Sequence, residues 1–223
     1  MRPKPVIAID GPSGAGKSTV ARELARALGF QFVDTGALYR TVALLADEGG
    51  VDWSHGPRLA KLVEGHEFAF DSKGALYLDG DPVGDAMRTP RMSLGASEVA
   101  QHSEVREALL VIQRVIGKDG GVVLEGRDIG TVVFPDAEIK FFLDASVLER
   151  ARRRFEELLA KGRDITLDQI AREQEERDRS DRERTLSPLR KADDAIDVPC
   201  DDMTAVQVVE HMLAIVKSQF SFD

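Results

Sequence analysis

The sequence predicts an α/β fold in which a parallel sheet is flanked by helices, and three observations support it. Short apolar runs alternate along the chain with longer segments whose apolar residues recur at helical spacing. A glycine-rich segment joins the first apolar run to the first helical segment, which predicts a loop at the ligand-binding edge of such a sheet. Only residues 51–90 depart from this order, because they hold the short alternating segments of an antiparallel hairpin.

The first strand is expected at Val6–Asp10, an apolar run that ends in one acid. The helix after it carries Val20 and Leu24 on one face and is expected to stop at Gly29. Between them, residues 11–18 read G-P-S-G-A-G-K-S and satisfy G-x-x-x-x-G-K-[ST], in the strand–loop–helix context that this phosphate-binding motif requires. We therefore predict a P-loop NTPase fold.

The residues of this loop indicate how a nucleoside triphosphate would bind. Glycines allow successive backbone N–H groups to curl around phosphates, and the helix N-terminus adds its partial positive charge. Lys17 can reach the β- and γ-phosphates, and the Ser18 hydroxyl can ligate Mg²⁺, the expected metal cofactor. A merely glycine-rich turn is the alternative, and the three filled motif positions argue against it. The residues predicted to bind the triphosphate are Gly11, Pro12, Ser13, Gly14, Ala15, Gly16, Lys17, Ser18 and Thr19.

The elements after the first helix continue the alternation. A second strand at Phe30–Asp34 leads through a Thr35-Gly36 turn into a helix that ends at Gly49. Residues 51–95 are predicted to be an insertion, in which a hairpin pairs residues 67–70 with residues 75–78. The other expected elements are a helix at Ser93–Gly117, strands at Val122–Leu124 and Ile139–Leu143, helices at Ser146–Lys161 and Thr166–Arg184, a strand at Ala195–Val198 and a helix at Thr204–Phe220.

Composition limits the classes of function. The chain has 223 residues, a formal net charge of −9 and one cysteine, Cys200. This acidity argues against a nucleic-acid partner, and a lone cysteine excludes an internal disulfide or a cysteine zinc site. No secretion signal or membrane-length apolar run is visible, so we expect a cytoplasmic protein with no membrane partner. Asparagine is absent, which excludes the N-K-x-D signature of switch GTPases.

Charged residues cluster at three further places. Glu125–Asp128 follows a buried strand at the ligand-binding edge, although a structural Arg127–Asp128 pair or a helix cap is an equal alternative. Two arginine-rich helical faces follow this segment. Their arginines could close over bound substrates, and the alternative is that they form solvent-exposed salt bridges of little consequence. Their members are Arg150, Arg153 and Arg154 on one face and Arg177, Asp181 and Arg184 on the other.

Several strings together indicate a family. They are G-P-S-G-A-G-K at 11–17, D-T-G-A-L-Y-R at 34–40, E-G-R-D-I-G-T-V-V-F-P at 125–135 and F-L-D-A-S at 142–146, followed by E-R-D at 176–178 and S-P-L at 187–189. The chain resembles the bacterial cytidylate kinases over nearly its whole length. The resemblance implies one P-loop kinase domain, residues 1–223, with a small monophosphate-binding insertion and a short helical lid at 150–184.

The resemblance also implies a role for individual residues. Thr35 stands where the family has a serine near the sugar. Glu125 stands where aspartate is expected, so a metal-linked role for Glu125 is doubtful. The implied CMP-binding residues are Ser97, Arg106 and Asp128 at the cytosine, Arg40, Arg127 and Arg184 at the acceptor phosphate, and Thr35, Arg177 and Asp181 near the sugar. The implied catalytic residues are Lys17, Arg127, Arg154 and Arg184, and Arg150 and Arg153 join the ATP-binding residues.

The implied reaction is ATP-dependent phosphorylation of CMP, with dCMP as a second acceptor, by a chain expected to be a monomer. Two alternatives stay open. One is a P-loop kinase for another acceptor, such as UMP, AMP or a shikimate-like compound; the insertion and the G-R-D string weigh against it. The other is a nucleotide-dependent switch or binding protein, which no feature of the sequence favours.

Overall fold

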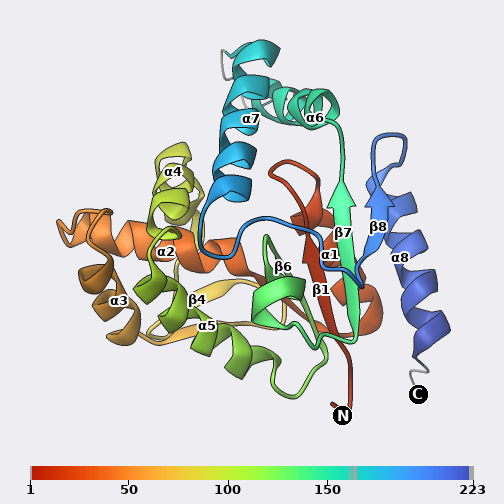
Figure 1. Cartoon of the computed structure of the whole chain (residues 1–223), viewed down its shortest axis with the longest axis horizontal. Helices are drawn as coiled ribbons and strands as arrows, with labels where there is room; N and C mark the ends of the chain where they lie inside the picture. Colours follow the sequence, from red (N-terminus) through yellow and green to blue (C-terminus); the bar gives the residue numbers. More distant parts are fainter. Residues whose placement is uncertain (1, 161, 163–164, 221–223) are drawn as a thin grey trace.

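The central sheet has five parallel strands in the order β2-β6-β1-β7-β8 (Figure 1). The computed structural model describes residues 2–160, 162 and 165–220; the expected helix end at Lys161 and both ends of the predicted domain lie outside these residues. The predicted α/β fold with a parallel sheet is confirmed. Its strands are β1 (Val6–Asp10), β2 (Gln31–Asp34), β6 (Val122–Gly126), β7 (Ile139–Asp144) and β8 (Ile196–Pro199).

Helices cover both faces of the sheet because the side chains of each strand alternate between the faces. Val6 and Ala8 of β1 pack in one core with α2 (Thr35–Glu48) and α5 (Ser103–Gly117). Ile7 and Ile9 pack in the other with α1 (Lys17–Leu28) and α8 (Ala205–Gln219). Both cores leave the carboxyl ends of the strands open to a cleft.

The insertion contains the predicted hairpin, formed by β3 (Phe68–Phe70) and β4 (Leu76–Leu78) in antiparallel register. A short strand, β5 (Asp81–Pro82), completes a separate three-stranded sheet. The structure adds a helix that we did not predict, α3 (Gly56–Glu64), whose buried Leu59 and Val63 lie one turn apart. The i, i+4 spacing of these two apolar residues could have predicted this helix from the sequence.

Two expectations about helices were wrong. The predicted helix at Ser93–Gly117 is two helices, α4 (Pro90–Val99) and α5, because the chain becomes extended at His102, whose ring Nε2 lies 2.9 Å from the Trp53 carbonyl oxygen. The predicted turn at Thr35-Gly36 is the first turn of α2. Asp34 caps this helix by accepting a hydrogen bond from the Ala37 N–H at 3.0 Å, so the helix begins directly after the strand.

Trp53 fixes the position of α4 against α2. Its Nε1 donates to the Ala43 carbonyl at 3.0 Å, and the Arg91 guanidinium lies 5.0 Å from the centre of its ring. A Cβ on Gly95 would come within 2.8 Å of the ring, so the absence of a side chain there allows α4 to pack closely. α4 carries Ser97 on the wall of the cleft.

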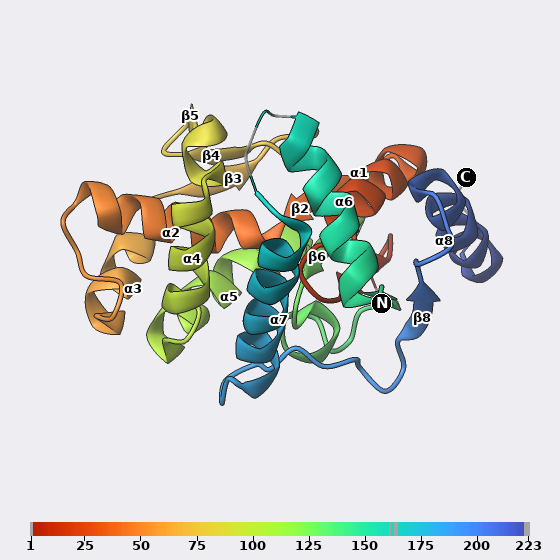
Figure 2. The same cartoon turned by 90° about the horizontal axis from the view of Figure 1, so that it is seen from above.

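Two arginine-rich helices, α6 (Val147–Ala160) and α7 (Leu167–Glu183), lie beyond the carboxyl end of β7 (Figures 1 and 2). We call them the lid helices. Thr166 and Gln169 form a capping box that begins α7.

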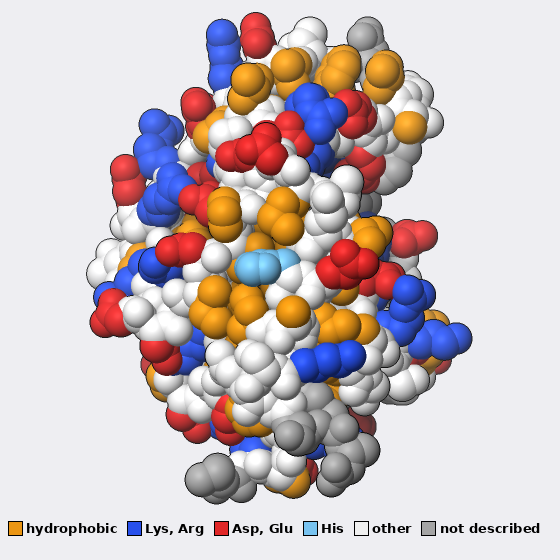
Figure 3. Space-filling view, turned by 90° about the vertical axis from the view of Figure 1, so that its right-hand side faces the viewer, with side chains coloured by type: hydrophobic (Ala, Val, Ile, Leu, Met, Phe, Trp, Pro, Cys, Tyr) orange, Lys and Arg blue, Asp and Glu red, His pale blue; other side chains and the backbone are white. Residues whose placement is uncertain are grey.

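No helix in the described part of the chain is long and apolar enough to cross a bilayer. On the face beside α8, acidic, basic and apolar side chains are interspersed (Figure 3).

Candidate active site

A cleft of about 1360 Å³ lies at the carboxyl edge of the sheet. Its walls come from the phosphate loop, the start of α2, α4, the end of β6, both lid helices and the segment that follows β8. This is the edge at which ligands bind in open parallel sheets. Every predicted site residue except Gly11 and Pro12 lines the cleft.

The phosphate loop adopts a conformation that requires its glycines. Gly11 has φ +152°, and a Cβ there would lie 2.0 Å from the Leu143 carbonyl oxygen, so the loop crosses β7 in direct backbone contact. Gly16 has φ +87° and precedes α1 in the left-handed region. A glycine-rich loop that ends at a helix N-terminus is the arrangement that anion-binding sites use.

Lys17 is a buried cation that forms no ion pair with a carboxylate of the described residues. Its side chain is only 5 % exposed, and Nζ donates to the Pro12 carbonyl at 2.6 Å. Burial, and next the positive charge of Arg127, lower the pKa of Lys17 to about 7. A bound polyphosphate would supply the missing negative charge, so this electrostatic environment favours an anionic ligand.

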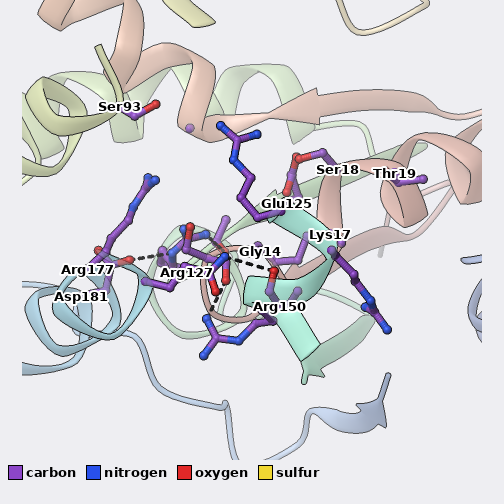
Figure 4. A pocket seen from close by; sticks show the side chains of 18 of the residues that line it. Gly14, Lys17, Ser18, Thr19, Ser93, Glu125, Arg127, Arg150, Arg177 and Asp181 are labelled. Carbon is purple, nitrogen blue, oxygen red and sulfur yellow. Dashed lines mark hydrogen bonds and ion pairs between the residues drawn. The ribbon is translucent and has the colours of Figure 1, made fainter. Parts of the chain in front are cut away.

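Glu125 and Ser18 face each other beside the loop (Figure 4). Burial, and next the charge of Asp34, raise the pKa of Glu125 to about 7, and its Oε1 has no hydrogen-bond partner. A carboxylate and a hydroxyl are the oxygen donors that Mg²⁺ prefers when substrate phosphates supply further ligands. The described residues contain no group of three or more His, Cys, Asp or Glu side chains placed to hold a metal by themselves.

Four arginines form ion pairs with three carboxylates on the acceptor side of the cleft. Arg127 Nε lies 2.8 Å from Asp181 Oδ2, and Arg184 lies 3.7 Å from Asp181 and 4.0 Å from Asp128. Asp128 also pairs with Arg106. Arg40 pairs with Asp34 at 2.7 Å, while its own Nε is buried without a partner.

Arg177 is different from these arginines. No hydrogen bond or ion pair joins its guanidinium to any residue that the structure describes, and its Nε is buried. Burial, and next the charge of Arg127, lower the pKa of Arg177 to about 10. Figure 4 shows its side chain extending into the cleft from α7. An anionic ligand would therefore stabilise the charged forms of both Arg177 and Lys17.

Thr35 and Ser97 line the cleft but have partners within the protein. The Thr35 hydroxyl, nearly fully buried, donates to the Glu125 carbonyl at 2.7 Å and so links the start of α2 to β6. The Ser97 hydroxyl donates to the Ser93 carbonyl at 3.4 Å. A hydroxyl proton can rotate to a new acceptor, and the Ser97 contact is long enough for such an exchange.

The three arginines predicted on α6 occupy different environments. Arg150 is buried and bonds only to protein groups. Arg153 is half-buried, and it donates to Glu149 at 2.8 Å and to the Cys200 carbonyl. Arg154 is exposed and pairs with Glu157 at 2.6 Å. Arg153 and Arg154 can therefore reach a ligand by a change of side-chain conformation, whereas Arg150 is fixed.

Several cleft residues were not predicted from the sequence. Tyr39 packs under the Arg106 guanidinium, with 5.5 Å between the Arg106 Cζ atom and the ring centre, and its place in the D-T-G-A-L-Y-R string was the available signal. Beside the cleft, the Ser187 hydroxyl and carbonyl accept hydrogen bonds from Arg106 and Arg184 at 3.1 and 2.6 Å. Residues 200–205, between β8 and α8, line the cleft beside Arg153, and no sequence motif marked them.

Known proteins resemble this chain over nearly its whole length. A family model described as "Cytidylate kinase" matches residues 7–218. The chain is 50 % identical to the cytidylate kinase of Pelotomaculum thermopropionicum, covering 98 % of both chains, and 46 % identical to that of Geobacter sulfurreducens, covering 96 % of this chain and 93 % of the relative. A crystal structure of an uncharacterized protein from Eubacterium ventriosum, 12 % identical, has a TM-score of 0.53 over 96 % of this chain and 99 % of its own, which shows a shared fold. The chain belongs to the cytidylate kinase family.

Proposed function

We propose that this chain transfers the γ-phosphoryl group of ATP to CMP, with dCMP as a second acceptor. One observation carries the proposal: Lys17 on the phosphate loop and Arg177 on the lid face the same cleft, and both lack a carboxylate partner. Two anionic substrates, one on each side, would neutralise them. The relatives named cytidylate kinase support the choice of acceptor.

On the donor side, the backbone N–H groups of the phosphate loop and Lys17 hold the β- and γ-phosphates. Thr19, which is exposed at the start of α1, would lie beside these phosphates. Arg153 and residues 200–205 form the neighbouring wall, which we assign to the adenosine of ATP. Arg154 turns from Glu157 toward the transferring group when the lid closes.

On the acceptor side, the phosphate of CMP is already largely ionised at neutral pH because its second pKa is about 6, so no general base is needed. Arg40, Arg127 and Arg184 hold this phosphate. Arg177 and Asp181 lie near the sugar beside Thr35, where the adjoining phosphate neutralises Arg177. Catalysis then rests on alignment of the two phosphates and on positive charge that stabilises the transferring group.

Base recognition falls to Asp128, Arg106 and Ser97. Cytosine has an exocyclic amine that a carboxylate can accept, whereas uracil presents a carbonyl oxygen at the same place. Asp128 is buried and held by Arg106, so it cannot turn away from an unsuitable base at low cost. Uracil would place its carbonyl oxygen against this carboxylate, and UMP is therefore the poorer acceptor.

The residues present fit a magnesium ion. The Ser18 hydroxyl and the Glu125 carboxylate, whose Oε1 has no partner, would hold it beside the triphosphate. The ion would neutralise phosphate charge. Glu125 stands where the resemblance leads us to expect aspartate, and it supplies the same kind of carboxylate oxygen. The substitution is therefore compatible with a role in holding the metal.

The insertion at 51–95 and the lid at 150–184 would close over the substrates from opposite sides. The monomeric state, the cytoplasmic location and the lack of a nucleic-acid partner stay predictions.

The function is tested by release of ADP from Mg-ATP with CMP, dCMP, UMP, AMP and shikimate as acceptors. We expect CMP and dCMP to give the highest kcat/KM. A better AMP, UMP or shikimate reaction, or ATP binding without ADP release for any acceptor, would contradict the proposal.

A further inference from the structure

The apex of the phosphate loop is held by two residues of the lid helices. The Ser13 N–H donates to Asp178 Oδ1 on α7 at 3.1 Å, and the Ser13 carbonyl accepts from Arg150 on α6 at 2.6 Å. Arg150 and Asp178 also pair with each other at 2.7 Å, and each side chain is only 2 % exposed. Both backbone polar groups of one loop residue thus bond to one buried ion pair.

The same face of α7 contacts the next loop residue. Gln174 lies one turn before Asp178, and its Nε2 donates to the Arg150 carbonyl at 3.3 Å. A Cβ on Gly14 would come within 2.7 Å of this Nε2, so the glycine allows α7 to rest directly on the loop. α6 and α7 therefore contact the donor site through three side chains.

All three nitrogens of the Arg150 guanidinium are engaged within the protein. Its Nε donates to the Ala145 carbonyl at 2.9 Å, Nη1 donates to the Ser13 carbonyl, and Nη2 forms the ion pair with Asp178. Breaking the pair would leave a buried charge uncompensated, which is strongly unfavourable. Arg150 thus differs from Arg153 and Arg154 on the same helix, which bond to groups at the protein surface or edge of the cleft.

The position of Asp178 in α7 links this contact to the acceptor site. Arg177 precedes it, and Asp181, the partner of Arg127, follows one turn later. We propose that Arg150 and Asp178 are positioning residues that lock the phosphate loop to α7, so that the donor loop and the acceptor-side Arg177 and Asp181 keep one fixed spacing. This proposal rests on the proposed function and replaces the predicted role of Arg150 as an ATP ligand.

The test compares Asp178→Asn, Arg150→Met and the double variant, with Arg179→Met as the control for loss of an exposed arginine from α7. We expect each single variant to lower kcat/KM for both ATP and CMP by about 10²-fold, because the spacing of the reacting groups is lost. The double variant should lose little more than either single variant, since both remove the same interaction. Arg179→Met should match the parent protein.

An ATP ligand would behave differently. Arg150→Met would then raise KM for ATP alone, Asp178→Asn would leave both KM values unchanged, and the effects in the double variant would add. Any of these outcomes would overturn the proposal. Asp178→Asn preserves side-chain shape, so it keeps the test valid if Arg150→Met does not fold.

Limited trypsin digestion provides a readout that needs no catalysis. With the lock broken, the arginine-rich α7 should be cleaved faster in Asp178→Asn than in the parent protein or in Glu176→Gln, a control that keeps every arginine of α7 and also removes an acid beside Arg177. Equal cleavage rates would overturn the proposal even if CMP phosphorylation is normal. Conversely, a parent protein that fails to phosphorylate CMP but shows this protease difference would contradict the proposed function alone.

Discussion

Arg127, at the end of β6, donates its Nε to Asp181 on α7 at 2.8 Å, so one ion pair connects the edge of the sheet to the lid. The pair spans 54 positions of sequence. It holds a guanidinium at the point where the carboxyl edge of the sheet meets the acceptor side of the cleft.

Loss of this guanidinium should affect the chemical step most. We expect Arg127→Met to lower kcat for CMP phosphorylation by about 10²–10³-fold, because a fixed cation near the transferring group stabilises developing charge. Steady-state kinetics at saturating Mg-ATP and CMP measure this effect. Arg114→Met, which removes an arginine bonded only to the Val132 and Val133 carbonyls, is the control. A kcat for Arg127→Met equal to that of this control would remove Arg127 from the catalytic residues.

Asp128 should determine the preference for cytosine. We expect Asp128→Ala to narrow the ratio of kcat/KM between CMP and UMP by about tenfold or more, because a buried carboxylate no longer faces the uracil carbonyl oxygen. The matched control is Asp136→Ala, which removes an exposed carboxylate from the same chain segment. An unchanged CMP-to-UMP ratio in Asp128→Ala would show that another group reads the base.

Glu125 should make the stability of the ligand-free protein fall as pH rises. Its pKa is about 7 in the folded chain against 4.5 as the ordinary value, so the folded state retains a proton that the unfolded state releases. The stability that this proton confers is fully present below about pH 4.5 and is lost as pH rises through about 7.

The variant Glu125→Gln carries no such proton. We expect it to be more stable than the parent protein at pH 8 by up to about 3 kcal/mol, and to lose that advantage at pH 4.5. Urea unfolding at the two pH values, without nucleotide or metal, measures the difference. A constant difference between parent and variant across this range would contradict the assigned pKa.

Gly11 should tolerate no side chain. We expect Gly11→Ala to destabilise the protein by about 3 kcal/mol or more, because its Cβ would overlap the Leu143 carbonyl oxygen at a strained φ. Gly80→Ala is the matched control, since Gly80 also has positive φ but has open space around it, and about 1–2 kcal/mol is expected. Thermal unfolding that ranks the two variants equally would show that the loop can shift away from β7.

The phosphate loop and the sheet could be predicted because their signals are local. The motif at residues 11–18, the strand before it and the helical spacing of Arg177, Asp181 and Arg184 each lie within one element or one turn. Spacing on one helix face is decided by backbone geometry alone. The structure places residues 13–18 of the motif together with Arg177, Asp181 and Arg184 at the same cleft.

What the sequence could not predict depends on contacts between elements distant in the chain. Arg150 looked equivalent to Arg153 and Arg154, yet only Arg150 meets an acid on α7, and that pairing follows from how α6 and α7 cross. The division between α4 and α5 was missed for the same reason, since His102 is extended by its contact with Trp53 in the insertion.

Trp53 also makes the acceptor wall observable by spectroscopy. It is the only tryptophan in the chain, and its ring contacts Arg91 and Gly95 of α4, the helix that carries Ser97. Fluorescence excited at the red edge of indole absorption therefore comes from one known position. Its intensity and wavelength would follow any displacement of α4 in real time, without an attached dye.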